Sequence, residues 1–135
     1  MSREGFRHDR TTDEVLDGID LTGQVALVTG GSRGIGVETA REAVAESIRE
    51  STGNPKVEVE ELELGSLKSI RAFADRFLKK HDRLNILINN AGVMACPQGT
   101  TEDGFEMQFG TNHIGHFLMT CLIAPALIKG SPSRI

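Results

Sequence analysis

Several glycines crowd the segment Thr29–Gly36, TGGSRGIG, which directly follows the apolar run Val25–Val28. Gly30 permits a tight turn with positive φ, and Gly34 and Gly36 lack side chains that would keep a diphosphate away from the backbone. Where a helix begins after such a turn, its free amides point toward an anion and its dipole favours negative charge. The spacing therefore predicts a loop that binds the diphosphate of a nucleotide.

Strand-like and helical segments alternate on both sides of this loop. Apolar residues run together or alternate in the first kind and recur at helical spacing in the second. The order predicts an α/β fold, Rossmann-like, with a partial parallel sheet in a three-layer α/β/α arrangement. The expected elements are a strand at 25–28 buried on both faces, a helix at 37–51, a strand at 56–64, a helix at 67–80 capped by Ser66, a strand at 86–88, a helix at 103–129 and the start of a strand at 134–135.

Two parts of the chain differ in character. Residues 1–19 are expected to form a polar N-terminal arm with a short helix at 12–17. Residues 20–135 are expected to form one partial Rossmann-type dinucleotide-binding domain. In such a parallel sheet, ligands bind at the carboxyl ends of the strands. The glycine segment lies at that end of the first strand, which supports its interpretation as a binding loop.

The composition is typical of a globular domain, with 39% hydrophobic and 25% charged residues and a net charge of −4. Lys and Arg are not clustered, and Tyr and Trp are absent, which argues against a nucleic-acid partner. The apolar run 117–128 is shorter than the ~20 residues that span a bilayer, and the polar amino terminus has no apolar signal core. We therefore expect a cytoplasmic protein with no transmembrane segment.

Three rival sites fit the sequence less well. A P-loop needs Lys followed by Ser or Thr where the chain has Val37–Glu38. His113, His116 and Cys121 lie near one another in the sequence, but no carboxylate or further ligand has a matching spacing, so no metal site is expected. A nucleophile at Cys96 has no third group placed to support it. Neither cysteine has a disulfide spacing, and we expect both to be reduced.

Three motifs occur in the same order as in one known protein family. Thr29–Gly36 resembles the TGxxxGIG cofactor loop of the short-chain dehydrogenase/reductase family, and Asn89–Gly92 resembles its NNAG motif. Asn112, within TNHIGHF, matches the family's helix-borne active-site asparagine. The resemblance covers residues 20–135 and is greatest to the retinol-dehydrogenase-like branch. It implies a Rossmann fold and hydride transfer between NAD(P) and an alcohol or carbonyl carbon.

The resemblance also implies residue roles. An Arg directly before Gly34 is similar to NADP-preferring members, because a guanidinium can pair with the 2′-phosphate. We therefore expect NADP as the cofactor, with NAD as the alternative. Asn112 is implied as the catalytic residue, which opens the helix backbone and helps to order a water in a proton relay. The implied cofactor-binding residues are Thr29, Gly30, Ser32, Arg33, Gly34, Ile35, Gly36, Glu63, Leu64, Asn90, Ala91 and Gly92.

The chain departs from the family pattern in two places. The family's catalytic Ser, Tyr and Lys would follow Ile135, and the chain contains no Tyr. A strand and part of a helix are also missing near 43–47. Lys56–Leu64 is then either the second strand of a βαβ unit, with Glu61 or Glu63 as the acid on the ribose, or the family's third strand, with Glu63 next to the adenine. We expect this strand to pair with residues 25–28, because an empty slot would leave buried backbone groups unpaired.

These observations favour an incomplete and inactive form of an NAD(P)-dependent oxidoreductase, whose full-length relatives act on small alcohol or carbonyl substrates. The alternative is a non-catalytic fragment that binds a dinucleotide or modulates a partner. A homo-oligomer stays open as well, because the apolar run 117–128 could present a face to a second copy. A methyltransferase-like Rossmann binder fits less well, since the NNAG and asparagine motifs count against it.

Overall fold

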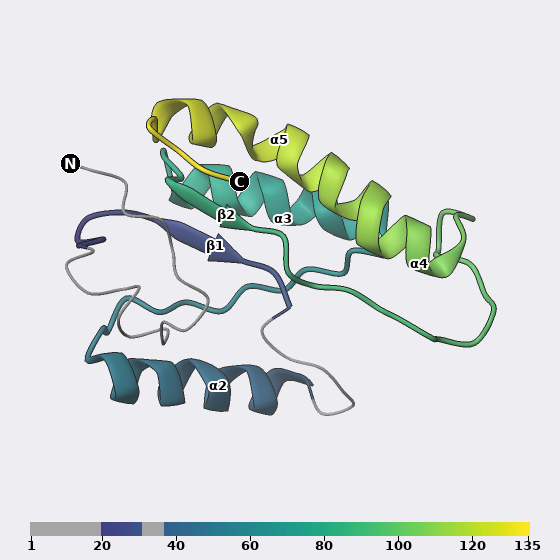
Figure 1. The fold of residues 1–135 in the computed structure, drawn as a ribbon, viewed down its shortest axis with the longest axis horizontal. Coiled ribbons are helices and arrows are strands. Elements are labelled where there is room, and N and C mark those ends of the chain that lie inside the picture. The colour runs from purple at the N-terminus through teal and green to yellow at the C-terminus, as the bar shows by residue number, and fades with distance from the viewer. Residues whose placement is uncertain (1–19, 31–36) are drawn as a thin grey trace, which may run out of the picture.

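The structure, a computed structural model, describes residues 20–30 and 37–135, with side chains from residue 42 onward in the second range. The arm and the short helix expected within residues 1–19 lie outside the described residues. The elements shown in Figure 1 are, in chain order, β1 (Ala26–Val28), α2 (Val37–Thr52), α3 (Leu67–Lys80), β2 (Ile86–Ile88), α4 (Met107–Phe109), the π-helix η1 (Gly110–Gly115) and α5 (His116–Lys129).

The two strands pair in parallel, as the alternation of strands and helices predicted. Leu27 faces Leu87 in the register, and Val28 faces Ile88. On its other edge β2 forms a parallel bridge to Arg134, which confirms the strand-like start expected at the end of the chain. The sheet of the described residues therefore has β1 at one edge, β2 in the centre and Arg134 at the other edge.

Asn85 joins three segments at the amino end of this sheet. Its Oδ1 accepts the backbone N–H of Val25 at 2.9 Å, and its Nδ2 donates to the backbone oxygen of Gly130 at 2.7 Å. A side chain on Gly130 would lie 2.1 Å from the oxygen of Leu84, so only glycine fits where α5 ends against β2. This amide therefore fixes the start of both strands to the end of α5.

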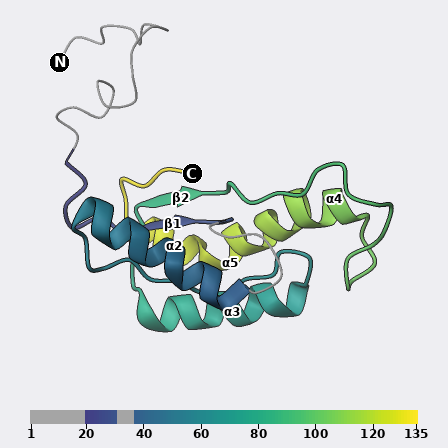
Figure 2. The ribbon, with the colours of Figure 1, turned by 90° about the horizontal axis from the view of Figure 1, so that it is seen from below.

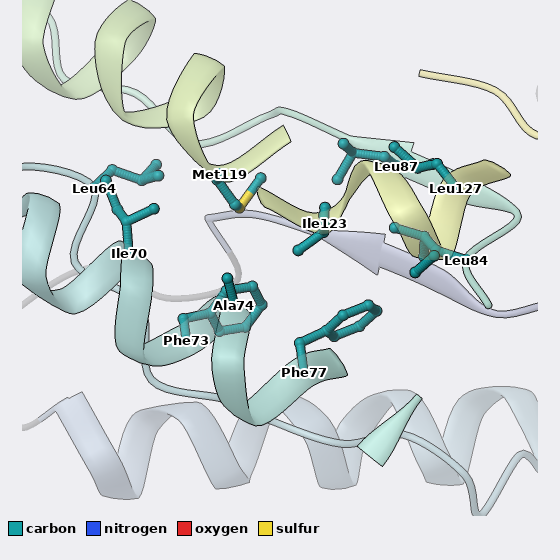
Figure 3. Packing of buried hydrophobic residues seen from close by; sticks show 11 residues of the cluster. Leu64, Ile70, Phe73, Ala74, Phe77, Leu84, Leu87, Met119, Ile123 and Leu127 are labelled. Atoms are coloured by element: carbon teal, nitrogen blue, oxygen red, sulfur yellow. The ribbon is translucent and has the colours of Figure 1, made fainter. Parts of the chain in front are cut away.

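The hydrophobic core lies between α3, α5 and one face of the strands. Ser66 caps α3 as predicted, and its side chain accepts the backbone N–H of Ser69. Figures 1 and 2 show α3 and α5 on the same side of the two strands. Figure 3 shows side chains from α3 and α5 pointing into the same space as Leu87 from β2. The buried cluster consists of Leu64, Ile70, Phe73, Ala74, Phe77, Leu84, Leu87, Met119, Ile123, Ala126 and Leu127.

The other face of the strands is exposed. Val28 is 53% exposed, Ile88 is 46% exposed and Ala26 is exposed as well. The expectation that residues 25–28 are buried on both faces is therefore wrong. Successive strand residues point to opposite faces, and α3 and α5 contact only the face that carries Leu27 and Leu87.

Helix α2 has the predicted bounds within one residue but is less buried than its stripe suggested. Ala45 is buried, whereas Val44 and Ile48 are 40% and 42% exposed. Figure 1 shows α2 beyond the outer edge of β1, with the following coil between them. The helix therefore lies alongside the sheet edge and leaves part of its apolar stripe in contact with solvent.

The strand predicted at 56–64 does not form, and the segment is coil with a turn at its end. Side chains satisfy backbone groups that a ladder would have used. Arg49 donates from Nε and Nη2 to the oxygen of Val57 at 3.1 and 2.7 Å. Arg76 donates from Nη2 to the oxygen of Glu61 at 2.6 Å. The coil is thus attached to α2 and α3 by long polar side chains.

Charge pairs reinforce the attachment of this coil to α3. Lys80 Nζ lies 2.9 Å from the Glu58 carboxylate and 3.5 Å from that of Glu60. The hydrogen bond to Lys80 lowers the pKa of Glu58, and the same bond raises the pKa of Lys80. Because these groups are about half exposed, water and salt screen the pairs and each adds little stability.

The hypothesis that this segment pairs with β1 is therefore wrong. It assumed that the outer edge of β1 is buried, where unpaired backbone groups would be costly. The exposed residues Ala26 and Val28 show that solvent reaches this strand, so its backbone groups can bond to water. Four glutamates within 58–63 also disfavour a strand that would lie between α2 and the sheet.

The last helix runs from Met107 to Lys129 and starts four residues later than predicted. Residues 101–105 form a turn in which Thr101 N–H donates to the oxygen of Phe105 at 2.8 Å. Glu106 then caps the helix. By length and composition this helix could cross a membrane. An 18-residue stretch of it has a mean hydropathy of 1.2, and 39% of that stretch is buried inside the protein. A core helix of a soluble protein meets the same criteria, so the finding is weak and the expected lack of a transmembrane segment stays a prediction.

Candidate functional site

Two turns meet at the carboxyl ends of β1 and β2. Thr29 and Gly30 follow β1, and the motif Asn89–Gly92 follows β2. Gly30 has φ +92°, the positive value that the tight turn was predicted to need. A Cβ at this position would lie 2.8 Å from the Cα of Ala91. The two turns therefore touch backbone to backbone, and only glycine permits this approach.

The Thr29 side chain holds the second turn in place. It is buried, and its Oγ1 accepts the backbone N–H groups of Asn90 and Ala91, each at 3.0 Å. In return, Asn90 Nδ2 donates to the backbone oxygen of Thr29 at 3.2 Å. The structure thus brings together four of the predicted cofactor-binding residues, Thr29, Gly30, Asn90 and Ala91, at one end of the sheet.

Asn112 fastens the segment after this turn to the last helix. Its Oδ1 accepts the backbone N–H of Val93, and its Nδ2 donates to the oxygen of the same residue, both at 2.8 Å. Gly92 is the predicted cofactor residue that packs against this amide, since a Cβ there would lie 3.3 Å from Asn112 Oδ1. The side chain of Asn112 therefore has a positioning role, and Val93 is the partner that sequence reasoning missed.

The helix backbone around Asn112 does not follow the α-helical hydrogen-bond pattern. Residues Gly110–Gly115 form the π-helix η1, and the backbone N–H of His116 donates to the oxygen of His113. π-Helical turns occur mostly as single turns within α-helices and are frequent at functional sites. The close contact of Gly115 with Leu64 also shapes this turn, because a Cβ on Gly115 would lie 2.4 Å from the Leu64 oxygen. The water that Asn112 was expected to order stays a prediction.

His116 joins this π-helix to the end of β1. Its Nε2 lies 2.9 Å from Thr29 Oγ1, and its Nδ1 lies 2.9 Å from the oxygen of Asn112. From the sequence, His116 is a candidate only for a metal site. The available signal was its position four residues after Asn112, on the same side of the helix.

Glu63 and Leu64 lie where the coil enters α3. One oxygen of the exposed Glu63 carboxylate accepts the backbone N–H of Gly65 at 2.9 Å, and Ser69 Oγ lies 3.0 Å from the Glu63 backbone nitrogen. Leu64 is part of the core. A contact of Leu64 with the cofactor would therefore use its backbone. The predicted roles of both residues toward the ribose or adenine stay predictions.

Five predicted cofactor residues, Ser32, Arg33, Gly34, Ile35 and Gly36, lie outside the described residues. The diphosphate-binding part of the loop is thus a prediction that the structure leaves untested. Within the described part of the chain, no group of three or more His, Cys, Asp or Glu residues is placed to hold a metal ion. Cys96 and Cys121 are both free thiols.

Comparisons with known proteins agree on one family. The family model for short chain dehydrogenase matches residues 41–135. Retinol dehydrogenase 13 of Mus musculus is 46% identical over 134 residues, covering 85% of this chain and 40% of that protein. Retinol dehydrogenase 11 of Homo sapiens is 46% identical over 136 residues, covering 87% of this chain and 43% of that protein. The chain spans about two fifths of the length of these relatives.

Solved structures agree with this assignment. A metagenomic short-chain oxidoreductase in complex with NADP superimposes with a TM-score of 0.64 at 28% identity, over 81% of this chain and 58% of that one. A short-chain dehydrogenase/reductase of Serratia marcescens, 24% identical with a TM-score of 0.60 over 78% of this chain and 51% of that one, shows the likeness of fold alone. These likenesses confirm the predicted Rossmann-like α/β fold with a partial parallel sheet. The chain belongs to the short-chain dehydrogenase family and, within it, resembles the retinol dehydrogenases.

Proposed function

We infer that this chain binds NADP at the carboxyl ends of β1 and β2 and contributes the dinucleotide-binding part of an oxidoreductase site. The observation that carries the proposal is the contact between Gly30 and Ala91, which brings the two turns together at the position where dinucleotides bind in open α/β sheets. When bound, the nicotinamide group would supply hydride chemistry.

The described residues fit such a ligand. Gly30 and Gly92 both lie where a Cβ would meet a neighbouring residue, Ala91 in the first case and the Asn112 side chain in the second, so glycine keeps both turns free of side chains of their own at these positions. Helix α2 begins at Val37, directly after the glycine segment, and its first amides would favour the diphosphate. Arg33 would pair with the 2′-phosphate of NADP, and a preference over NAD rests on this residue of the sequence.

The chain's own contribution to chemistry would be binding and orientation. Thr29 holds the Asn90–Ala91 part of the second turn, and Asn112 holds Val93 directly after it. The sequence contains no Tyr, which is the general acid that the family resemblance implies. We therefore propose that this chain binds cofactor but does not carry out efficient hydride transfer alone.

Calorimetric titration with NADP and with NAD tests the binding. We expect saturable binding of NADP by the chain and a loss of affinity of about tenfold or more in Gly30→Ala, because a Cβ there collides with Ala91 and strains the backbone. Gly53→Ala is the matched control. Gly53 also has a positive φ, +65°, but nothing lies within 4 Å of its Cβ position, so binding should be unchanged. No binding by the unaltered chain would contradict the proposal.

A turnover assay separates the two readings of this site. The chain is incubated with NADPH and a panel of aldehydes, ketones and retinoids, and oxidation of the nicotinamide is followed by absorbance. Binding without turnover supports a cofactor-binding chain that is inactive by itself or modulates a partner. Turnover that is lost in Gly30→Ala would instead make this chain a complete enzyme and would overturn the proposed lack of activity.

A further inference from the structure

The polarity of the hydrogen bonds around His116 can be worked out from its neighbours. The ring is only 6% exposed. Its Nδ1 lies 2.9 Å from the backbone oxygen of Asn112, and a carbonyl oxygen can only accept, so Nδ1 must carry a proton. In a neutral imidazole, Nε2 is then an acceptor. The ring therefore donates to the π-helix and accepts from the end of β1.

The Thr29 hydroxyl agrees with this polarity. A hydroxyl oxygen has two lone pairs and one proton. The two lone pairs accept the N–H groups of Asn90 and Ala91. The proton is left for His116 Nε2 at 2.9 Å or for the oxygen of Ile88 at 3.5 Å. The longer distance is at the limit of a hydrogen bond, so the proton points to His116.

We propose that His116, as the neutral tautomer with its proton on Nδ1, is a positioning residue for the dinucleotide site. Its Nε2 orients the Thr29 hydroxyl so that both amides of the Asn90–Ala91 turn stay bound. Its Nδ1 ties this orientation to the carbonyl of Asn112. The identity of the ligand rests on the proposed function, whereas the positioning itself is a property of the protein alone.

Loss of the Nε2 acceptor has a specific consequence. The Thr29 proton then has only the Ile88 oxygen at 3.5 Å, so the hydroxyl rotates and its lone pairs leave the two amides. The Asn90–Ala91 turn loses its anchor next to Gly30, where the backbones are already in contact. The defect should therefore appear at this turn, while the core between α3 and α5 stays intact.

The first experiment reads the ring directly. Nitrogen-15 NMR of the histidine side chains at neutral pH distinguishes a protonated from an unprotonated ring nitrogen. We expect Nδ1 of His116 to be protonated and Nε2 to be an acceptor. In Thr29→Val the Nε2 signal should move toward that of a free acceptor, and in Thr29→Ser it should stay. A signal from Nε2–H or from a doubly protonated ring in the unaltered chain would overturn the proposal.

The second experiment measures the turn without any ligand. Hydrogen exchange of the Asn90 and Ala91 amides should be about tenfold faster in His116→Phe, which keeps a ring but has no nitrogens. His116→Gln, which keeps a donor and an acceptor, should restore much of the protection. His113→Phe is the matched control, because His113 is exposed and stacks on Phe109 at 5.2 Å. Unchanged exchange of both amides in a folded His116→Phe would overturn the proposal.

NADP titration of the same variants then links the turn to the ligand. We expect His116→Phe and Thr29→Val each to weaken binding by about tenfold. Their double variant should be no weaker than the worse single one, since both remove the same hydrogen bond. If the unaltered chain binds no NADP, the proposed function fails, and the ring and amide measurements still decide the role of His116. Additive losses in the double variant would contradict the shared bond.

Discussion

The segment from Leu64 to Gly130 and the described part of the preceding segment are held together by different means. The first contains the buried core between α3 and α5. In the second, α2 leaves Val44 and Ile48 exposed, and the coil at 56–64 is attached by side-chain hydrogen bonds from Arg49 and other polar residues. Helix α2 thus depends on long polar side chains where α5 depends on packing.

This difference shows how the fold changes because the strand predicted at 56–64 does not form. A ladder beside β1 would have fixed the coil by backbone hydrogen bonds and given α2 a surface to cover. Without it, β1 is the edge of the sheet that the described residues form, and solvent reaches Val28. The candidate site joins the two segments, because Gly30 belongs to the first part of the chain and contacts Ala91 of the segment from Leu64 to Gly130.

Truncation of a core side chain should have the largest effect. Phe73 is almost fully buried between α3 and α5, so Phe73→Ala is expected to cost about 3–5 kcal/mol of unfolding free energy. Ile48→Ala removes a similar apolar group from the partly exposed face of α2 and should cost about 1 kcal/mol or less. Urea unfolding followed by circular dichroism measures both. Equal losses would mean that α2 is as well packed as α3, which would contradict the difference between the two segments.

The connection between the packed segment and the site should be the next most sensitive. Asn112→Asp keeps an acceptor for Val93 N–H but places a second acceptor against the Val93 oxygen, where Nδ2 now donates. We expect a loss of about 1–3 kcal/mol in stability and faster hydrogen exchange of Val93. Gln108→Glu, on an earlier turn of the same helix, serves as the charge control. A stable Asn112→Asp with unchanged exchange at Val93 would refute the anchoring role.

Removal of the Arg49 guanidinium should separate α2 from the coil. Arg49→Met keeps the aliphatic part of the side chain but frees the Val57 oxygen and two carboxylates, those of Glu42 and Glu46. We expect faster proteolysis between α2 and α3, with little change in exchange protection of α5. Arg83→Met, which removes only an exposed pair with Asp82, should leave proteolysis unchanged. Faster exchange in α5 would show that the two segments are not independent.

The smallest effect is expected from acid at the start of the last helix. Glu106 accepts the N–H groups of Phe109 and Gln108, and these bonds lower its pKa from 4.5. The stabilisation from Glu106 is therefore fully present above pH 4.5, and it is lost as the pH falls through the lower pKa that Glu106 has in the folded protein. At neutral pH the unaltered chain should therefore unfold at a higher temperature than Glu106→Gln. The difference should vanish in acid, and a difference that persists there would point to another cause.

Local signals in the sequence predicted the well-packed elements. The Ser66 cap and the spacing of Leu67, Ile70, Ala74 and Phe77 gave α3 its bounds, and the apolar triplet 86–88 gave β2. These elements form as predicted because their side chains meet a complete core. The positive φ at Gly30 was also predictable, since the turn chemistry depends on local backbone geometry.

Long-range choices were harder to predict. Val57 and Val59 alternate as in a strand, yet a strand forms only where a partner edge and a buried face exist. In the described residues the segment 56–64 pairs with neither β1 nor β2, so it has neither. The partners of Asn112 and His116 were likewise invisible in the sequence, because Val93 and Thr29 come near them only once β1, β2 and α5 are assembled.

The polar side chains at the two ends of the strands help to set the register between β1 and β2. Each strand has only three residues, too few for the ladder alone to select one alignment. Asn85 binds Val25 at one end, and Thr29 binds the Asn90 amide at the other. A slip by one residue would break both and would turn Leu87 out of the core. These two side chains thus fix the register of β1 and β2 from both ends, and with it the position of Gly30 next to Ala91.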